Sequence, residues 1–184
     1  MASAYVVSVA RLQREAPAVW EVNVQAPFDA ATDRGGLTPT ASDVPDGAVV
    51  TIALRLESYE GGLRARGTVR APWRGSCRRC LAPVEGQVEA VIDERFVHEE
   101  RDDDDELAYR YQGDEVDLAP LVHDAVFLEL PLAPLCRPDC QGLCPQCGAD
   151  RNVAPCACRA PSDPRWDTLD ALRFDVETGG TGGA

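Results

Sequence analysis

The sequence predicts an α+β protein with an antiparallel, β-rich core, arranged as a meander for which a barrel-like form is an option. Three observations support this fold class. Apolar and polar residues alternate with period two through residues 49–92, where Glu60-Gly61-Gly62 provides a reversal. One later stretch, residues 118–130, has apolar residues at helical spacing. Eight cysteines occur mostly in close pairs, which is typical of small stapled elements.

The first 48 residues predict two short strands and a long loop. The strands lie within residues 4–26, on either side of 11–14, and the second alternates Trp20, Val22 and Val24 with polar residues. Residues 27–48 are rich in Ala, Asp, Thr, Gly and Pro and are predicted to form a loop.

The predicted meander has three strands whose inward positions are all apolar. The first strand points Arg55 and Glu57 away from the core. The inward residues are Ile52, Leu54 and Leu56, then Leu63, Ala65, Val69 and Ala71, and finally Val84, Val88, Ala90 and Ile92. Period-two alternation therefore gives a sheet with one buried face.

The opposite face of the second strand is basic. All 18 basic residues of the chain are arginine, and residues 55–79 hold seven of them against Glu57 and Glu60. Arginine pairs bidentately with phosphate, so this surface could contact an RNA backbone, and a solvated sheet face is the equally weighted alternative. The candidate RNA-binding residues are Arg64, Arg66, Arg70, Arg74, Arg78 and Arg79.

The net charge of −13 comes mainly from one region. Residues 93–117 hold twelve acidic residues against three arginines. Such a run predicts a solvated loop, over residues 98–116. The charge by itself argues against nucleic acid as a partner, and it would suit a basic protein.

Residues 117–176 are predicted to hold a helix, a cysteine-rich region and a second helix. Asp117 is the expected N-cap of an amphipathic helix, in which Leu118, Leu121, Val122, Ala125 and Leu128 face the sheet and His123 is partly exposed. Asp163-Pro164-Arg165-Trp166 would open the last helix, with Leu169 and Leu172 in its stripe. Residues 1–176 are expected to form one domain, β-rich over 1–97, with a flexible tail at 177–184.

The cysteines predict two structural zinc sites. Close pairs of thiolates from short turns are what tetrahedral zinc requires. The simplest partition places Cys144, Cys147, Cys156 and Cys158 in one site, and Cys77, Cys80, Cys136 and Cys140 in the other. Cys136 or Cys140 could instead replace Cys156 or Cys158. Four sulfur ligands leave no open position, which indicates a structural metal.

Disulfides are the main alternative for these cysteines. Residues 1–13 contain no recognisable secretory signal, and no stretch has the roughly 18 apolar residues of a membrane span. The chain is therefore expected in the reducing cytoplasm, where zinc is favoured over disulfides.

Several spaced motifs together resemble one protein family. They are Cys77-Arg78-Arg79-Cys80-Leu81, Asp117-Leu118, Cys136-x3-Cys140-Gln141-Gly142-Leu143-Cys144-Pro145-Gln146-Cys147-Gly148, Cys156-Ala157-Cys158 and Asp163-Pro164-Arg165. This set, over residues 5–175, resembles the YceD family, the large-ribosomal-RNA-subunit accumulation proteins. The resemblance implies a non-enzymatic bacterial factor for accumulation or processing of 23S ribosomal RNA, whose partner is precursor rRNA or a large-subunit assembly intermediate, with no small-molecule substrate or membrane.

Three other functions were weighed against this one. A zinc-stapled protein adaptor would use the acidic surface and not bind RNA directly. A redox enzyme or redox-controlled chaperone would use the Cys77-x2-Cys80 spacing, but no βαβ context accompanies it. A zinc deaminase would use His98 and Glu100 with Cys144 and Cys147, but Leu143 stands where that signature needs Pro.

Overall fold

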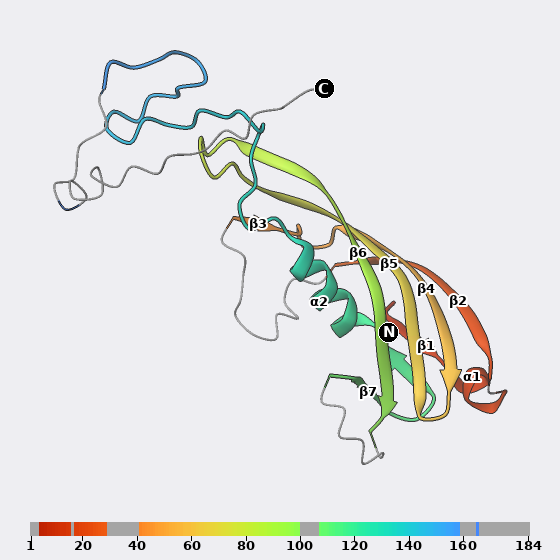
Figure 1. Cartoon of the computed structure of the whole chain (residues 1–184). Helices are drawn as coiled ribbons and strands as arrows, with labels where there is room; N and C mark the ends of the chain where they lie inside the picture. Colours follow the sequence, from red (N-terminus) through yellow and green to blue (C-terminus); the bar gives the residue numbers. More distant parts are fainter. Residues whose placement is uncertain (1–3, 16, 29–40, 100–106, 159–164, 166–184) are drawn as a thin grey trace, which may run out of the picture. The chain divides into compact units, whose positions relative to one another are not determined.

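The computed structural model describes residues 4–15, 17–28, 41–99, 107–158 and 165 (Figure 1). The chain divides into two compact units, Met1–Gly142 and Leu143–Ala184. The first unit holds every named strand and helix. The second is described over 143–158 and contains a cysteine-rich loop. Whether residues 1–176 behave as one domain stays a prediction.

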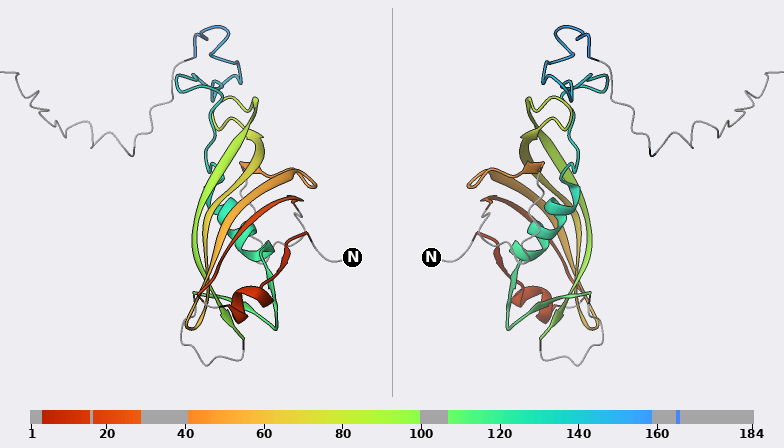
Figure 2. Two further views of the ribbon diagram at one scale, coloured as in Figure 1. Left: turned by 90° about the vertical axis from the view of Figure 1, so that its right-hand side faces the viewer. Right: turned by 90° about the vertical axis from the view of Figure 1, so that its left-hand side faces the viewer.

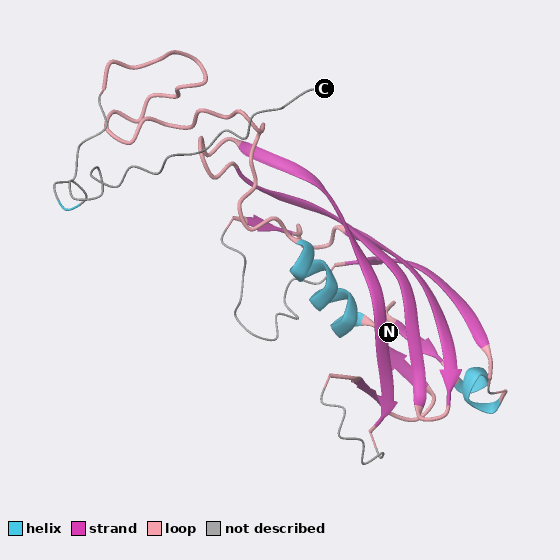
Figure 3. Cartoon of the chain, in the orientation of Figure 1, coloured by secondary structure: helices cyan, strands magenta, loops and turns pink. Residues whose placement is uncertain are grey.

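The first unit is built on a six-stranded sheet (Figure 3). Its strands are β2 (Val19–Pro27), β3 (Ser42–Asp43), β4 (Val49–Tyr59), β5 (Gly62–Ser76), β6 (Pro83–His98) and β7 (Tyr109–Tyr111). The order is β2-β4-β5-β6-β7, with β3 paired to β5, and every pair is antiparallel except β6–β7. The predicted meander is therefore present as β4-β5-β6. A second sheet pairs β1 (Val6–Ser8) with β8 (Glu115–Asp117).

The sheet is open, so the barrel-like form is wrong. A barrel closes only when its last strand pairs with its first. Within the described residues β2 pairs only with β4, and β7 pairs with β6 over three residues, opposite Phe96, Val97 and His98. Figure 2 shows the long strands curving past the helix α2, which lies on one side of the sheet.

The core lies on the predicted face of the long strands. Burial alternates along β4, β5 and β6, because successive side chains of a strand point to opposite faces. The buried residues include Ile52, Leu54 and Leu56 of β4, Leu63, Ala65, Val69 and Ala71 of β5, and Val88, Ala90 and Ile92 of β6. Val84 is only half-buried, at the start of β6.

Helix α2 (Ala119–Glu129) packs against β5 and β6 close to the predicted position. It has Pro120 in its first turn, where proline is tolerated, and ends at Leu130, whose extended backbone precedes Pro131. The predicted N-cap, Asp117, is wrong by one residue, because the N-cap is Leu118; Asp117 Oδ1 nevertheless accepts the Ala119 N–H at 2.9 Å. One predicted core residue is wrong: Leu128 is 82% exposed, because the buried stripe continues through Val126 and Leu130.

Two predicted loops contain regular structure. Residues 98–116 were expected to form an acidic loop, but β6 extends to His98, and β7 and β8 follow. Their apolar residues Tyr111 and Val116 are buried, which a loop pattern does not predict. Within 27–48, β3 pairs with the end of β5. Residues 29–40 and 100–106, the last helix from Asp163 apart from Arg165, and the tail lie outside the described residues.

The N-terminal region contains a helix between its two strands. The five-residue helix α1 (Ala10–Arg14) occupies the segment that was expected to separate them, and it buries Leu12. Trp20 of β2 is 43% exposed although Val22 is buried. No helix in the part of the chain that the structure describes has the length and apolar character to cross a membrane.

Candidate metal centres and the arginine face

The first cysteine group joins the β5–β6 hairpin to the segment after α2. Cys77 and Cys80 lie in the connection between the two strands, and Cys136 and Cys140 follow α2. The four sulfurs all lie within 4.8 Å of one another. Cys77 Sγ is 3.8 Å from Cys140 Sγ, and Cys80 Sγ is 3.6 Å from Cys136 Sγ.

Backbone hydrogen bonds hold the connection between the strands in a tight turn, residues 77–82, called here the first knuckle. The Cys77 N–H donates to the Ala82 carbonyl at 2.7 Å, and the Leu81 N–H donates to the Cys77 carbonyl at 2.8 Å. The Arg78 N–H donates to the Pro134 carbonyl at 2.8 Å, which fixes the turn against the segment after α2. Both halves of the first group are thus positioned by backbone contacts independent of any metal.

The second cysteine group lies within the second unit. Cys144, Cys147, Cys156 and Cys158 place their sulfurs within 4.8 Å of one another. Residues 144–149 form the second knuckle, in which the Cys144 N–H donates to the Ala149 carbonyl at 2.8 Å. Asp150 then accepts the Asn152 N–H at 2.9 Å and so closes the next turn.

The sulfur environments suit thiolates held by a cation. Burial raises the pKa of Cys77, but N–H groups of Cys136, Cys80 and Arg79 outweigh it and lower the pKa to about 6. The N–H groups of Cys147 and Gln146 likewise lower the pKa of Cys144 to about 6.

Crowding of the sulfurs raises the pKa of two other thiols, Cys136 and Cys158. The neighbouring Cys80 sulfur raises the pKa of Cys136 to about 12, and the Cys147 sulfur raises that of Cys158 to about 12. Four thiolates this close together need a bound positive charge, because each added anion opposes the next.

The donor sets fit a tetrahedral metal. A tetrahedron with metal–sulfur bonds of about 2.3 Å has edges of about 3.8 Å, which matches the two sulfur separations of the first group. A disulfide would require about 2.05 Å, and all eight cysteines are free. Each group could therefore hold one metal ion, and the structure shows the first of the two partitions that the spacing left open.

The arginine face is the outward surface of the large sheet, carrying Arg55 of β4 and Arg64, Arg66 and Arg70 of β5. The strand register places Arg66 beside Arg55 on one side and beside Asp93 on the other. Arg64 donates to both Asp93 oxygens, at 2.6 and 2.8 Å. Alternation along β5 thus produces the predicted basic row, and the neighbouring strands add acidic partners to it.

Three carboxylates pair with arginines proposed from the sequence. Asp93 accepts from Arg64 and also from Arg66 at 3.3 Å, while Glu89 accepts from Arg70 at 2.5 Å. Asp43 of β3 accepts from Arg74 at 3.1 Å. These partners were missed because they come from other strands. A hairpin register centred on the first knuckle would have found Asp93 and Glu89, since it pairs them with Arg66 and Arg70.

The two knuckle arginines differ. Arg79 donates from Nη1 to the Cys140 carbonyl at 2.8 Å and to the Pro138 carbonyl at 3.4 Å, so it ties the turn to the other half of the first cysteine group. The Arg78 side chain is exposed and has no hydrogen-bond or ion-pair partner among the described residues. Arg78 therefore remains available for an external anion, and Arg79 has an internal structural role.

Among the described residues, those of the two enzyme alternatives are not brought into a catalytic arrangement, and Glu100 lies outside the described residues. His98 ends β6 and meets Tyr111 edge-on at a ring distance of 5.3 Å. In the described chain, His98 is in neither group of candidate metal ligands. Cys77 and Cys80 both belong to a four-cysteine group, where a metal would occupy the thiolates.

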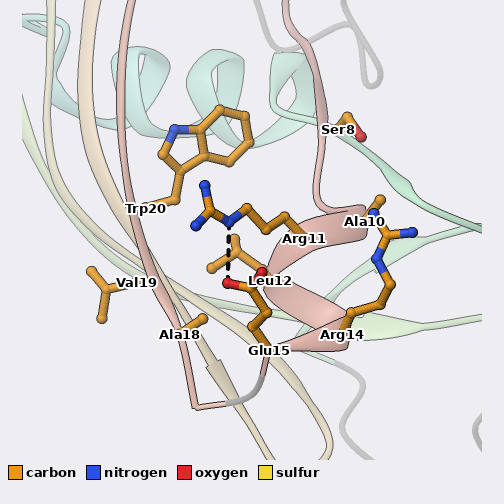
Figure 4. Close-up of a pocket in the computed structure, with 9 residues that line it drawn as sticks. All are labelled: Ser8, Ala10, Arg11, Leu12, Arg14, Glu15, Ala18, Val19 and Trp20. Carbon is orange, nitrogen blue, oxygen red and sulfur yellow. Dashed lines mark hydrogen bonds and ion pairs between the residues drawn. The ribbon is translucent and has the colours of Figure 1, made fainter.

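A pocket of about 530 Å³ lies between α1 and the start of β2 (Figure 4). Its charged groups include Arg14 and the exposed pair formed by Arg11 Nε and Glu15 Oε2 at 3.1 Å. Trp20 and Val19 supply its apolar wall. The lining contains no cysteine or histidine and no carboxylate pair, in contrast with the cysteine groups and the arginine face.

An open β-sheet with two four-cysteine groups, each of which could hold a metal ion, defines the class of protein. The particular family follows from the sequence itself. Residues 65–173 match the family described as "Large ribosomal RNA subunit accumulation protein YceD". The chain belongs to the YceD family, as its cysteine motifs predicted.

Related proteins occur in mycobacteria and in plant chloroplasts. An uncharacterized protein of Mycobacterium tuberculosis is 40% identical over 176 residues, which cover 92% of this chain and 81% of the relative. The "Large ribosomal RNA subunit accumulation protein YCED homolog 1, chloroplastic" of Arabidopsis thaliana is 29% identical over 172 residues. That match covers 77% of this chain and 54% of the plant protein. No solved structure matches the chain.

Proposed function

We propose that this protein is a non-enzymatic, cytoplasmic bacterial factor in the accumulation or processing of 23S rRNA during large-subunit assembly. The observation that carries the proposal is membership of a family named for accumulation of large-subunit ribosomal RNA. The partner is precursor rRNA or an assembly intermediate that contains it. The arginine face and the first knuckle are the proposed contact surface.

The geometry of the arginine face supports contact with a phosphate backbone. Arg64, Arg66 and Arg70 are aligned on one strand, on a face that no other element of the described chain covers. Their pairs with Asp93 and Glu89 are exposed, and exposed ion pairs contribute little free energy. A phosphate can therefore replace a carboxylate at small cost, while the carboxylates keep the arginines extended and ordered.

The metal in each cysteine group is proposed to be zinc. Zinc favours tetrahedral thiolate sites, and four sulfur ligands leave no position for a substrate. In the first group zinc would hold the first knuckle, and with it Arg78, in place. In the second group it would organise the loop of residues 144–158, which contains no named helix or strand.

Ultraviolet crosslinking in cells, followed by sequencing of the attached RNA, tests the proposal. Wild-type protein should enrich precursor 23S rRNA, and an Arg66→Glu/Arg70→Glu variant should lose that enrichment. An Arg11→Glu/Arg14→Glu variant carries the same charge change on α1 and should retain it. Equal enrichment by all three proteins would rule out the arginine face as the contact.

A zinc-stapled protein adaptor is the second candidate, and one observation favours it. The carboxylates of the outward face nearly balance its arginines, and the chain carries a net charge of −13. Such a surface suits a basic ribosomal protein. Copurification with one ribosomal protein that survives ribonuclease, without any RNA crosslink, would establish this function in place of RNA binding.

A further inference from the structure

The two knuckles have the same backbone conformation but differ at one informative position. Leu81 N–H donates to the Cys77 carbonyl at 2.8 Å, and Gly148 N–H donates to the Cys144 carbonyl at 2.9 Å. The next pair also matches, since Cys77 and Cys144 each donate to the alanine that ends the knuckle, at 2.7 and 2.8 Å. Leu81 in the first knuckle therefore corresponds to Gly148 in the second.

Both positions require the left-handed backbone region. Gly148 has φ of 71°, and Leu81 has φ of 63°, the one positive value among non-glycine residues in the described part of the chain. The conformation has a local reason, since it lets the Ala82 N–H reach the Cys80 sulfur. Glycine adopts it freely, whereas a leucine brings its Cβ close to the following carbonyl.

The Leu81 side chain gains little stabilisation within the molecule to offset its backbone strain. The side chain is 65% exposed, so it buries little apolar surface in the first unit. Residues in strained backbone persist where the surroundings enforce them, and they cluster at functional sites. The sequence of the second knuckle shows that the same fold is available with glycine. Leu81 is thus explained best by a contact outside the chain.

A second residue of the first knuckle, Arg78, indicates the chemistry of that contact. Arg78 belongs to the same turn, and its exposed side chain has no partner among the described residues, in contrast with the side chains of Arg64, Arg66, Arg70, Arg74 and Arg79. The second knuckle has Pro145 and Gln146 at the positions of Arg78 and Arg79. A cation beside an exposed apolar side chain matches a nucleotide, which offers a phosphate and the face of an unstacked base.

We propose that Leu81 and Arg78 form a nucleotide-binding tip on the first knuckle, in which Leu81 contacts an unpaired base of RNA and Arg78 binds its phosphate. This inference rests on the proposed function and adds a preference for single-stranded over duplex RNA. A base in a duplex is stacked on both sides, so its face is not available to Leu81. The second knuckle, with glycine and no arginine, would have a structural role alone.

The test compares zinc-loaded wild type, Leu81→Gly and Arg78→Gln on fluorescein-labelled fragments of precursor 23S rRNA. Each fragment is used as a single strand and annealed to its complement. Leu81→Gly should weaken binding to the single strands roughly fivefold, because it removes the apolar surface that the base would bury, and should leave duplex binding unchanged. Arg78→Gln should lower the slope of log affinity against log salt by about 0.7, as expected for one phosphate of a single strand.

Thermal stability and zinc content distinguish a role of Leu81 in RNA binding from a structural role. Leu81→Gly should have a Tm at or above that of wild type and should retain its zinc, because glycine fits the backbone at position 81. Leu128→Asn, which alters a comparably exposed leucine on α2, should bind as wild type does.

Three results would overturn the proposal. They are unchanged single-strand binding by Leu81→Gly, loss of its zinc, or equal weakening on duplex. If wild-type protein binds neither form of the RNA, the RNA contact of the proposed function fails as well. If wild-type protein binds the RNA fragments and both variants retain that binding fully, the knuckle proposal fails alone.

Discussion

Asp93 shows how a single carboxylate organises the arginine face. It accepts hydrogen bonds from Arg64 and Arg66, which stand two residues apart on β5. The bond from Arg64 is the largest influence on Asp93 and lowers its pKa to about 2 from an ordinary value of 3.8. The side chains are about half exposed, so the pair orders the arginines more than it stabilises the fold.

The pH dependence of this contact has a definite sign. Because the folded pKa is depressed, the contact is complete at neutral pH; its contribution to stability declines as the pH falls below about 3.8, and the contact itself is lost as the pH falls through about 2. Carboxyl carbon NMR of the wild type should show Asp93 titrating near 2. In Arg64→Gln its pKa should move back toward 3.8. An unshifted Asp93 in the wild type would contradict the paired geometry.

Gly142 is the residue that allows the first cysteine group to close. It has φ of 70°, and a Cβ there would lie 2.8 Å from the Arg79 carbonyl oxygen. Gly142→Ala should therefore release zinc from the first group at lower chelator concentration than wild type. Gly148→Ala has the same conformational cost, roughly 1–2 kcal/mol, but its Cβ meets nothing within 4 Å.

Comparing the two alanine variants separates the clash with the Arg79 carbonyl oxygen from the conformational cost of alanine at positive φ. Relative to wild type, Gly142→Ala should lower the zinc affinity of the first group more than Gly148→Ala lowers that of the second group. Zinc release during chelator titration measures both affinities. If the two variants behave alike, the contact with Arg79 has no energetic consequence.

At the scale of the element, the two four-cysteine groups lie in segments outside the named strands and helices. The first group holds the β5–β6 connection to the residues after α2, and Ser42 adds a second tie by donating to the Pro131 carbonyl at 2.7 Å. The second group organises residues 144–158, where the described chain has turns and an isolated bridge between Leu143 and Asp150. Removing one metal should therefore affect one element and spare the other.

Native mass spectrometry of paired Cys→Ser variants checks this independence. Wild type should bind two zinc ions, because there are two groups of four sulfurs. Cys77→Ser/Cys80→Ser and Cys156→Ser/Cys158→Ser should each bind one. The first variant should also lower the protection of β5 and β6 amides near the knuckle in hydrogen exchange. Loss of both ions from either variant would show that the groups are coupled.

At the scale of the whole molecule, charge is separated along the sequence and recombined by folding. Seven arginines within residues 55–79 stand against a total of −13, and folding brings Asp43, Glu89 and Asp93 beside four of them. The field around the arginine face is thus weaker than the sequence count suggests. RNA affinity should depend on short-range pairing more than on long-range attraction.

Salt dependence measures this directly. Wild-type affinity for precursor fragments should fall steeply with salt, since each neutralised phosphate releases counterions. The Arg66→Glu/Arg70→Glu variant should show weaker binding and a shallower slope. A slope near zero for wild type would indicate that no phosphates are neutralised and would favour a protein partner. The Arg11→Glu/Arg14→Glu variant controls for net charge.

Much of the local structure was predictable because it depends on neighbouring residues. The alternation of Ile52, Leu54 and Leu56 fixed the buried face of β4, and Pro131 marked the end of α2, whose C-cap is Leu130. The cysteine spacing predicted four-sulfur groups. The predictions were wrong where burial depends on contacts between residues far apart in the sequence. Leu128 fits a helical stripe in sequence, yet the position of α2 on β5 and β6 buries Val126 and Leu130.

By itself, the sequence determined the meander, the cysteine motifs and the family, since each depends on spacing along the chain. Tertiary structure decided the rest, because it depends on which strands become neighbours. Strand register paired Arg66 with Asp93, and the limited pairing of β7 kept the sheet open. Folding also brought Cys136 and Cys140 to Cys77 and Cys80, which selected one grouping from those that spacing allowed.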